Sequence, residues 1–298
     1  MNLYCSGRGV PAVLFESGQG DSTRVWGLVQ PSVARFTRAC SYDRAGIGFS
    51  DASTRPRTSA NIADDLERLI VSARIALPLV LVGHSAGGMH MKLFADHHAA
   101  DVAGMVFVDP SHEDLGRRLW AMDPAYQSKY PEFLKQQESC TRASEAELTP
   151  GSTLFSDCVG DRDPRFSQAI NDAATIQGKS WTARSTWASE AYNIWFDSAD
   201  QVRAAARPFG DMPVIVLTHA PFPKTPSETQ EMRDAKNQLW LELHRQIAAL
   251  STRGRQRTVD GASHDIPFDK PQVVIEAVHY VVEQARSRGK TTPAGTPR

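Results

Sequence analysis

The stretch Leu79–Gly88 reads Leu-Val-Leu-Val-Gly-His-Ser-Ala-Gly-Gly. Its four leading apolar residues predict a buried strand, and a helix-compatible segment, Met89–His98, follows the last glycine. A serine between a strand and a helix occupies a tight, strained turn, in which side chains in place of Gly83 and Gly87 would collide with the neighbouring strand and helix. In this context the pattern Gly-x-Ser-x-Gly predicts that Ser85 is a nucleophile held above a sheet.

A glycine-rich loop near the N-terminus is a second candidate part of the site. The loop Glu16–Ser22 directly follows Ala12–Phe15, which reads as a short strand. Glycines let the backbone approach a ligand closely, and a helix that starts after Ser85 leaves its first N–H groups unpaired. We therefore expect the backbone N–H groups of Gln19 and Ala86 to form an oxyanion hole, the alternative for the loop being an ordinary turn.

Segments with strand and helix patterns alternate along most of the chain. This alternation predicts an α/β fold with a doubly wound, mostly parallel sheet and with ligands at the carboxyl ends of its strands. A chain of 298 residues is long enough for one large domain with an insertion. The expected strands are 3–5, 12–15, 39–42, 79–82, 102–108, 213–217 and 257–259, and the expected core helices are 25–37, 58–76, 227–252 and 271–286.

Residues 112–210 interrupt this alternation. They are polar, helical in pattern and rich in aromatic residues, and they contain no convincing strand. We expect them to form a helical cap over the site, with Ser185–Ala206 as its clearest helix. The core would then comprise residues 1–111 and 211–286, followed by a disordered tail at 287–298.

The aromatic side chains of the cap have two expected fates. Most would form the cap's own core, but one or two should line an apolar substrate pocket, for which Trp187 and Trp195 are the candidates. From the core we expect Gly18, beside the candidate oxyanion donor, and His84, next to the candidate nucleophile, to border the same pocket. The alternative for His84 is simple packing.

A serine hydroxyl needs a base, and the base needs an acid that orients it. Among the nine histidines, His264 is the best candidate base, because it lies in the loop after the last expected strand. Its alternative is a surface histidine. His90, His97 and His98 lie in the helix after Ser85, but no carboxylate completes a metal-ligand set at helical spacing, so we expect no metal site.

Four motifs together resemble the α/β-hydrolase superfamily. They are Gly83–Gly87, the loop Ser17–Gly20, the turn Asp43–Ser50 and the sequence Gly-Ala-Ser-His at 261–264. The resemblance extends over about residues 3–286, with the cap as an insertion. It implies a sheet in which the cap follows the sixth strand, a triad in the chain order serine, acid, histidine, and no cofactor.

The acid of this triad is expected after one of two neighbouring strands. In most members of the superfamily it follows the strand after the cap, but here that strand runs into Thr218–Pro223, which contains no carboxylate. Some haloalkane dehalogenases and zearalenone-type lactonases place it after the preceding strand, where this chain has Asp109. We expect Asp109 to be the acid. Asp234 and Asp260 are the rivals, and a turn-capping aspartate before Pro110 is the alternative.

The nucleophile then decides the reaction class. Dehalogenases and epoxide hydrolases of this fold have an aspartate in the tight turn between strand and helix. This chain has Ser85 at that position, which implies acyl transfer. We expect a small-molecule carboxylic ester or lactone with an apolar or aromatic part to be hydrolysed through an acyl-enzyme. The alternatives are amide or carbon–carbon bond hydrolysis, an acyltransferase or lyase reaction, and a ligand receptor with little turnover.

The composition excludes several other functions. The formal net charge is -1 and no long block of like charge occurs, so an electrostatic footprint for nucleic acid is absent. No run of about 18 apolar residues is present, so we expect no membrane span. Because the N-terminus lacks the basic and apolar regions of a signal peptide, a cytoplasmic location is the default expectation.

Four cysteines leave the redox compartment open. None forms a Cys-x-x-Cys pair, so we expect neither a zinc site nor a thioredoxin-type site. In a sheet of the resembled fold Cys5 and Cys40 would lie on neighbouring strands, and Cys140 and Cys158 share one loop-rich region. Two disulfides, which would mean an exported protein, and four buried thiols in a cytosolic enzyme are both compatible with the sequence.

Overall fold

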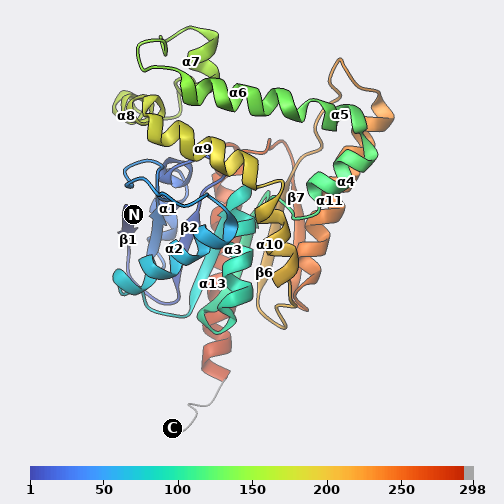
Figure 1. Ribbon diagram of the computed structural model, residues 1–298. Coiled ribbons are helices and arrows are strands. Elements are labelled where there is room, and N and C mark those ends of the chain that lie inside the picture. The colour runs from blue at the N-terminus through green and yellow to red at the C-terminus, as the bar shows by residue number, and fades with distance from the viewer. Residues whose placement is uncertain (292–298) are drawn as a thin grey trace.

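One seven-stranded sheet forms the centre of the protein (Figure 1). The computed structural model describes residues 1–291 of the 298. The strand order is β1-β3-β2-β4-β5-β6-β7, with β1 antiparallel to β3 and the other neighbours parallel, which confirms the doubly wound α/β fold. The strands are β1 (Leu3–Ser6), β2 (Ala12–Glu16), β3 (Ala39–Tyr42), β4 (Leu79–His84), β5 (Val102–Val108), β6 (Val214–His219) and β7 (Gly254–Val259).

Helices cover both faces of this sheet. In the core they are α1 (Gln30–Val33), α2 (Ser59–Ser72), α3 (Ala86–His97), α11 (Gln230–Ala249), α12 (Ile266–Asp269) and α13 (Pro271–Thr291), with the 3-10 turns η1 (Thr23–Trp26) and η2 (Ala99–Asp101). In β4, Leu79 and Leu81 pack with α2 and α3, whereas Val80 and Val82 pack with α1 and α13. Because side chains alternate between the two faces of a strand, a strand that is apolar throughout needs a helical layer on either side.

The helices between β5 and β6 lie within residues 112–210, the stretch expected to form the cap. They are α4 (Leu115–Met122), α5 (Pro124–Ser128), α6 (Tyr130–Arg142), α7 (Thr153–Cys158), α8 (Gln168–Lys179), α9 (Trp181–Asn193) and α10 (Asp197–Ala205). Figure 1 shows α6 to α9 across one end of the strands, whereas α10 packs through Val202 on Met89 and Leu93 of α3. The expected place of the insertion after the sixth strand is wrong, because the insertion follows β5. Only one antiparallel strand, β1, precedes the parallel strands of the sheet.

The expected helix Ser185–Ala206 is in fact two helices. The chain leaves α9 after Asn193, and Phe196 adopts a non-helical conformation with φ -125° and ψ -99° before α10 begins. Asp197 and Asp200 lie in the first turn of α10, where negative charge favours a new helix start. This break lets α10 turn away from the rest of the cap toward the core helices.

Three other boundaries differ from expectation. Residues 25–37 form only η1 and the short α1, because Pro31 is compatible with the first turn of a helix but not with its interior. The helix α11 starts after Thr229, whose side chain caps it, rather than after Ser227. The helix α13 continues to Thr291, into the expected tail; the rest of that tail, 292–298, lies outside the described residues.

All four cysteines are paired. Cys5–Cys40 joins the neighbouring strands β1 and β3, and Cys140–Cys158 joins α6 and α7 of the cap. Of the two interpretations that the sequence leaves open, the structure therefore contains the disulfides. Across residues 1–291, no helix combines the length and the hydropathy that a membrane span would need.

Candidate active site

The turn between β4 and α3 has the strained backbone that the sequence predicts. Ser85 has φ 52° and ψ -124°, a conformation that residues with a side chain rarely adopt. Cβ atoms added at Gly83 and Gly87 would lie 2.6 Å from the backbone oxygens of Gly87 and Glu16, so both positions require glycine. The Ser85 amide donates to the backbone oxygen of Val108 at 3.1 Å, which ties the turn to the end of β5.

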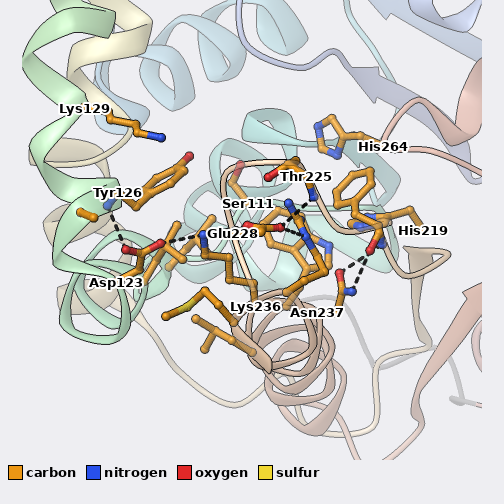
Figure 2. A pocket seen from close by; sticks show the side chains of 18 of the residues that line it. Ser111, Asp123, Tyr126, Lys129, His219, Thr225, Glu228, Lys236, Asn237 and His264 are labelled. Carbon is orange, nitrogen blue, oxygen red and sulfur yellow. Dashed lines mark hydrogen bonds and ion pairs between the residues drawn. The ribbon is translucent and has the colours of Figure 1, made fainter. Parts of the chain in front are cut away.

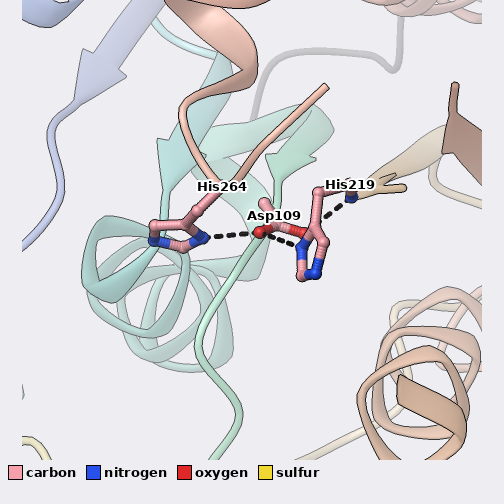
Figure 3. Close-up of side chains that lie close together, drawn as sticks. All are labelled: Asp109, His219 and His264. Atoms are coloured by element: carbon pink, nitrogen blue, oxygen red, sulfur yellow. Dashed lines mark hydrogen bonds and ion pairs between the residues drawn. The ribbon is translucent and has the colours of Figure 1, made fainter. Parts of the chain in front are cut away.

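Asp109, the residue after β5, is completely buried and accepts four hydrogen bonds. Figure 3 draws those from His219 and His264. Its Oδ2 lies 2.5 Å from His264 Nδ1 and 2.7 Å from His219 Nδ1. Its Oδ1 accepts from the His219 backbone N–H at 3.0 Å and from Trp240 Nε1 at 3.1 Å. Burial alone would raise the pKa of this carboxyl, but the hydrogen bonds from His219 and His264 outweigh burial and hold the pKa of Asp109 well below its usual range.

This carboxylate fixes the tautomers of both histidines. Because an ionised carboxylate can only accept, Nδ1 of His264 and Nδ1 of His219 each carry a proton, and each neutral ring keeps its lone pair on Nε2. The two rings flank the carboxylate of Asp109 (Figure 3). Burial lowers the pKa of His264, but the hydrogen bond and the charge of Asp109 raise it, and the net result is a pKa above the ordinary value.

The sequence did not predict two of these partners. His219 ends β6, the strand after the cap, and residues Thr218–Pro223 there contain no carboxylate. Trp240 lies on α11, 131 residues from Asp109 along the chain. A polar residue at the end of β6 is the signal that could have found His219, whereas no local pattern marks Trp240.

The rival acids lie elsewhere. Asp234 and Asp260 are exposed, and Asp234 accepts a hydrogen bond of 2.8 Å from Gln230 on its own helix. The carboxylate that the structure brings to His264 is therefore that of Asp109.

Asp109, His219 and His264 could in principle ligate a metal, because each offers a ligand atom within 4.8 Å of the others. In a tetrahedral site with metal–ligand bonds of about 2.0–2.1 Å, ligand atoms would lie roughly 3.3 Å apart. The two Nδ1 atoms instead lie 2.5 and 2.7 Å from the same carboxylate oxygen, within direct hydrogen-bond reach. The geometry thus fits a carboxylate shared by two imidazoles better than a metal site.

His84 connects the nucleophile turn with the loop of His264. Its Nε2 donates to the backbone oxygen of His264 at 3.0 Å, and the two rings lie 4.9 Å apart. Burial, together with the neighbouring His264, lowers the pKa of His84 to about 4, so this ring is neutral at physiological pH. His84 is buried and its ring packs on that of His264.

A cavity of about 900 Å³ lies between the core and the cap (Figure 2). Ser85, His219 and His264 all line it. Part of its lining is charged, and Lys236 pairs with Asp123 at 2.7 Å and with Glu228 at 3.3 Å. Another part consists of the apolar side chains of Leu115, Leu119, Ile194, Trp195, Leu239 and Trp240.

Four residues are expected to border the substrate pocket. Of these, Trp195 lines this cavity, whereas Gly18, His84 and Trp187 are not among its lining residues. Trp187 packs against Gly20 and the disulfide cluster of the cap, beside a smaller cavity of about 310 Å³. An aromatic residue on a cap helix can face either the site or the cap's own core, and sequence spacing did not distinguish these two faces.

The glycine-rich loop after β2 lies beside the nucleophile. A Cβ at Gly18 would lie 3.2 Å from Ser85 Cβ, and Gln19 lines the same cavity as Ser85. Ala86 is the first residue of α3, so its N–H has no partner within that helix. Both residues expected to form the oxyanion hole therefore border the site of Ser85.

The chain is similar to known proteins over most of its length. It is 26% identical over 300 residues to the "Probable transporter efuK" of Hormonema carpetanum, covering 94% of this chain but only 40% of that relative. It is 26% identical over 269 residues to the uncharacterized protein YqjL of Bacillus subtilis (strain 168), covering 90% of this chain and 82% of YqjL. The chain thus spans well under half of the first relative and most of the second.

Solved structures share the fold at low identity. An epoxide hydrolase candidate from Pseudomonas aeruginosa superimposes with a TM-score of 0.69 at 19% identity, covering 96% of this chain and 92% of that one. At this identity the similarity shows a common fold alone. The model of the alpha/beta hydrolase family matches residues 13–277. The chain therefore belongs to the alpha/beta hydrolase family, as its motifs implied.

Proposed function

We propose that the protein is a serine hydrolase of carboxylic esters or lactones that carry an apolar or aromatic group. The observation that carries this proposal is the 2.5 Å hydrogen bond between His264 Nδ1 and the buried Asp109, with His264 and Ser85 lining one cavity. The bond holds the proton on Nδ1 and leaves the lone pair of Nε2 for a reacting group, as a general base requires.

In the proposed reaction, His264 Nε2 takes the proton of Ser85 Oγ while that oxygen attacks the carbonyl carbon of the substrate. The N–H groups of Gln19 and Ala86 stabilise the negative charge that develops on the carbonyl oxygen. The protonated His264 then gives its proton to the leaving alkoxide, and an acyl ester of Ser85 remains. Water deprotonated by His264 releases the carboxylic acid and restores Ser85.

The choice of acyl chemistry rests on the nucleophile. Attack of a serine oxygen on an epoxide or on a carbon–halogen bond would form an ether, which water does not cleave under these conditions. Attack on an ester or lactone forms an acyl-serine, which water does cleave. Ser85 therefore favours a carbonyl substrate even though one structural relative is an epoxide hydrolase candidate.

The cavity supports the apolar part of the proposed substrate. The side chains beyond Ser85 include Leu115, Ile194 and Trp195 from the cap and Leu239 and Trp240 from α11. An acyl or alkyl group that leaves water for this lining gains roughly 25 cal/mol per Å² of apolar surface buried. The substrate class that fits is an ester or lactone with a hydrocarbon or aryl group attached to the reacting carbonyl.

The decisive experiment measures hydrolysis of p-nitrophenyl butyrate by the wild type and by Ser85→Ala, together with intact mass after treatment with a fluorophosphonate. We expect one adduct per wild-type chain, none on Ser85→Ala, and a fall in kcat of about 10⁴-fold or more in that variant. Circular dichroism controls for folding.

Three other outcomes contradict the proposal. A wild type that neither hydrolyses the ester nor accepts the label has no nucleophilic Ser85 and fits a ligand receptor. Hydrolysis that survives in Ser85→Ala assigns the chemistry to another residue. A wild type that passes its acyl group to an added alcohol much faster than to water is an acyltransferase.

A further inference from the structure

A buried arginine lies behind the loop that carries Gln19. Arg44, in the turn after β3, has a side chain that is 1% exposed, and its guanidinium makes five hydrogen bonds. It pairs with Glu16 at 2.5 Å and with both carboxylate oxygens of Glu190 at 2.7 and 2.8 Å. It also donates to the backbone oxygens of Ser17 at 2.8 Å and Gly18 at 2.7 Å.

The bond to Gly18 orients the proposed oxyanion donor. The C=O of Gly18 and the N–H of Gln19 belong to one peptide group, which is planar and trans, so the two bonds point in opposite directions. Because Arg44 Nη2 holds the carbonyl from behind, the amide of Gln19 points away from Arg44. Gly18 also lies against the nucleophile, since a Cβ built on it would be 3.2 Å from Ser85 Cβ.

The cap holds the next peptide of the same loop. Glu190 lies on α9 and is 146 residues from Arg44 along the chain. Besides binding Arg44, its Oε2 accepts a hydrogen bond of 2.8 Å from the backbone N–H of Gly20. The peptide before Gln19 is therefore fixed by Arg44 and the peptide after it by Glu190, so one buried ion pair between core and cap defines the loop on both sides of the donor.

We propose that Arg44 and Glu190 are positioning residues of the oxyanion hole. By binding Arg44 through Glu190, the cap sets the orientation and the hydrogen-bond strength of the Gln19 amide. A guanidinium on the carbonyl oxygen of a peptide polarises the N–H of that peptide, and a preorganised donor stabilises developing negative charge without reorganisation. This inference rests on the proposed serine hydrolase function. It adds that catalysis depends on an ion pair that touches neither the substrate nor Ser85.

The test compares Glu190→Gln with Ser180→Ala. The first replaces one of the two carboxylates that pair with Arg44 by an isosteric neutral amide. The second removes the side-chain cap of the same helix, where Ser180 Oγ accepts from the Ala183 N–H at 3.3 Å, and leaves the ion pair intact.

For each protein, an active-site titration with the fluorophosphonate gives the number of reactive Ser85 groups. The steady-state rate with p-nitrophenyl butyrate then gives kcat for each reactive site, and the Ki of butylboronic acid, which forms a tetrahedral adduct on serine, reports oxyanion binding.

We expect Glu190→Gln to lower kcat per reactive site about 10- to 100-fold, to weaken boronic acid binding by a similar factor and to change KM less than threefold. Ser180→Ala should lower the melting temperature but keep kcat per site and Ki. If Glu190→Gln has no reactive sites at all, Glu190→Asp, which keeps the charge but shortens the side chain, is judged by the same criteria.

Two results would overturn the inference. If Glu190→Gln and Ser180→Ala both lower only the melting temperature and the fraction of reactive sites, Glu190 is merely structural. If Glu190→Gln raises KM while kcat and the boronic acid Ki stay at wild-type values, the pair shapes the pocket and not the oxyanion hole. A wild type without turnover or label would instead refute the proposed function, and this inference with it.

Discussion

At the scale of single residues, the feature that distinguishes this site is a carboxylate shared by two imidazoles. Asp109 uses one oxygen for His264 and His219 and the other for Trp240 and the His219 backbone. All four partners are donors, so an ionised carboxylate satisfies every one of them, whereas a neutral amide does not.

Asp109→Asn should therefore lower kcat for p-nitrophenyl butyrate about 10³- to 10⁴-fold, because the amide stabilises neither the protonated His264 nor its reactive tautomer. The exposed Asp234→Asn serves as the control and should stay within twofold of the wild type. Near-full activity in Asp109→Asn would mean that another carboxylate, such as Asp260, orients the histidine.

The raised pKa of His264 predicts the acid limb of the pH profile. Protonated His264 cannot accept the Ser85 proton, so activity is present above its pKa and is lost as the pH falls through it. Because Asp109 raises this pKa, kcat/KM should decline with an apparent pKa above the ordinary histidine value of about 6.5. His84, with a pKa of about 4, titrates below this window. A measured limb near or below pH 5 would contradict the assignment of His264 as the base.

The side chain of His219 should affect the pH at which this acid limb occurs. In His219→Phe, Asp109 loses one competing donor, so its hydrogen bond to His264 strengthens and the acid limb should move up by roughly half a pH unit. In His219→Asn the amide N–H₂ replaces the Nδ1 donor, so the limb should return toward its wild-type position. Equal limbs in all three proteins would show that the second imidazole has no influence on the first.

Residues whose role depends on neighbouring sequence could be predicted, whereas residues whose role depends on distant partners could not. The motif around Ser85 and the place of His264 after the last strand are local signals, and both residues lie where the sequence places them. Asp109 required the family resemblance, because an aspartate before a proline is also an ordinary turn residue. His219 acquires its role only when the ends of β5 and β6 become neighbours in the sheet.

At the scale of elements, hydrophobic periodicity located the strands and most core helices, but it failed where tertiary contacts end a helix. The break between α9 and α10 is such a case, since α10 turns to pack on α3. The faces of the cap helices were equally hidden. Trp187 and Trp195 are both cap aromatics, but only Trp195 lines the large cavity.

The cap disulfide should stabilise the cap by restricting its unfolded states. Cys140 and Cys158 are 18 residues apart, a loop for which closure is worth about 3 kcal/mol. The double variant Cys140→Ser with Cys158→Ser should therefore unfold at a lower temperature and be cleaved by protease first within residues 112–210. The control, Cys5→Ser with Cys40→Ser, removes the bridge at the sheet edge and should not make the cap more susceptible.

A non-reducing thiol titration checks the premise of that comparison. The denatured wild type should show no free thiol before reduction and four afterwards. Four free thiols in freshly purified protein would contradict both bridges.

At the scale of the whole molecule, the cavity between core and cap predicts a substrate preference. Each methylene buried in its apolar lining contributes up to about 0.8 kcal/mol, so kcat/KM should rise roughly two- to fourfold per methylene from p-nitrophenyl acetate to hexanoate. Trp195→Ala should flatten this series, because Trp195 lines the cavity. Trp181→Ala is the matched control, since Trp181 is a cap tryptophan that is 63% exposed. A flat series in the wild type would contradict an apolar acyl site.

The strands of the sheet and the helical pattern of residues 112–210 are visible in the sequence, but the ion pair that connects the two is not. Arg44 lies in the turn Asp43–Ser50, directly after β3. Its partners Glu16 and Glu190 lie 28 and 146 residues away. No pattern within a window of the sequence contains such a pair, because burial of opposite charges is decided only after the cap has folded onto the core.

The same ion pair also resists movement of α9 away from the core. Lifting α9 would break both hydrogen bonds between Arg44 and Glu190, and α10 is held on α3 as well. Tyr126 and Phe222 also line the cavity and are 41% and 38% exposed. We expect the substrate to enter and the carboxylic acid product to leave past these two aromatic rings. Binding and release would then require rotation of side chains and no movement of the cap.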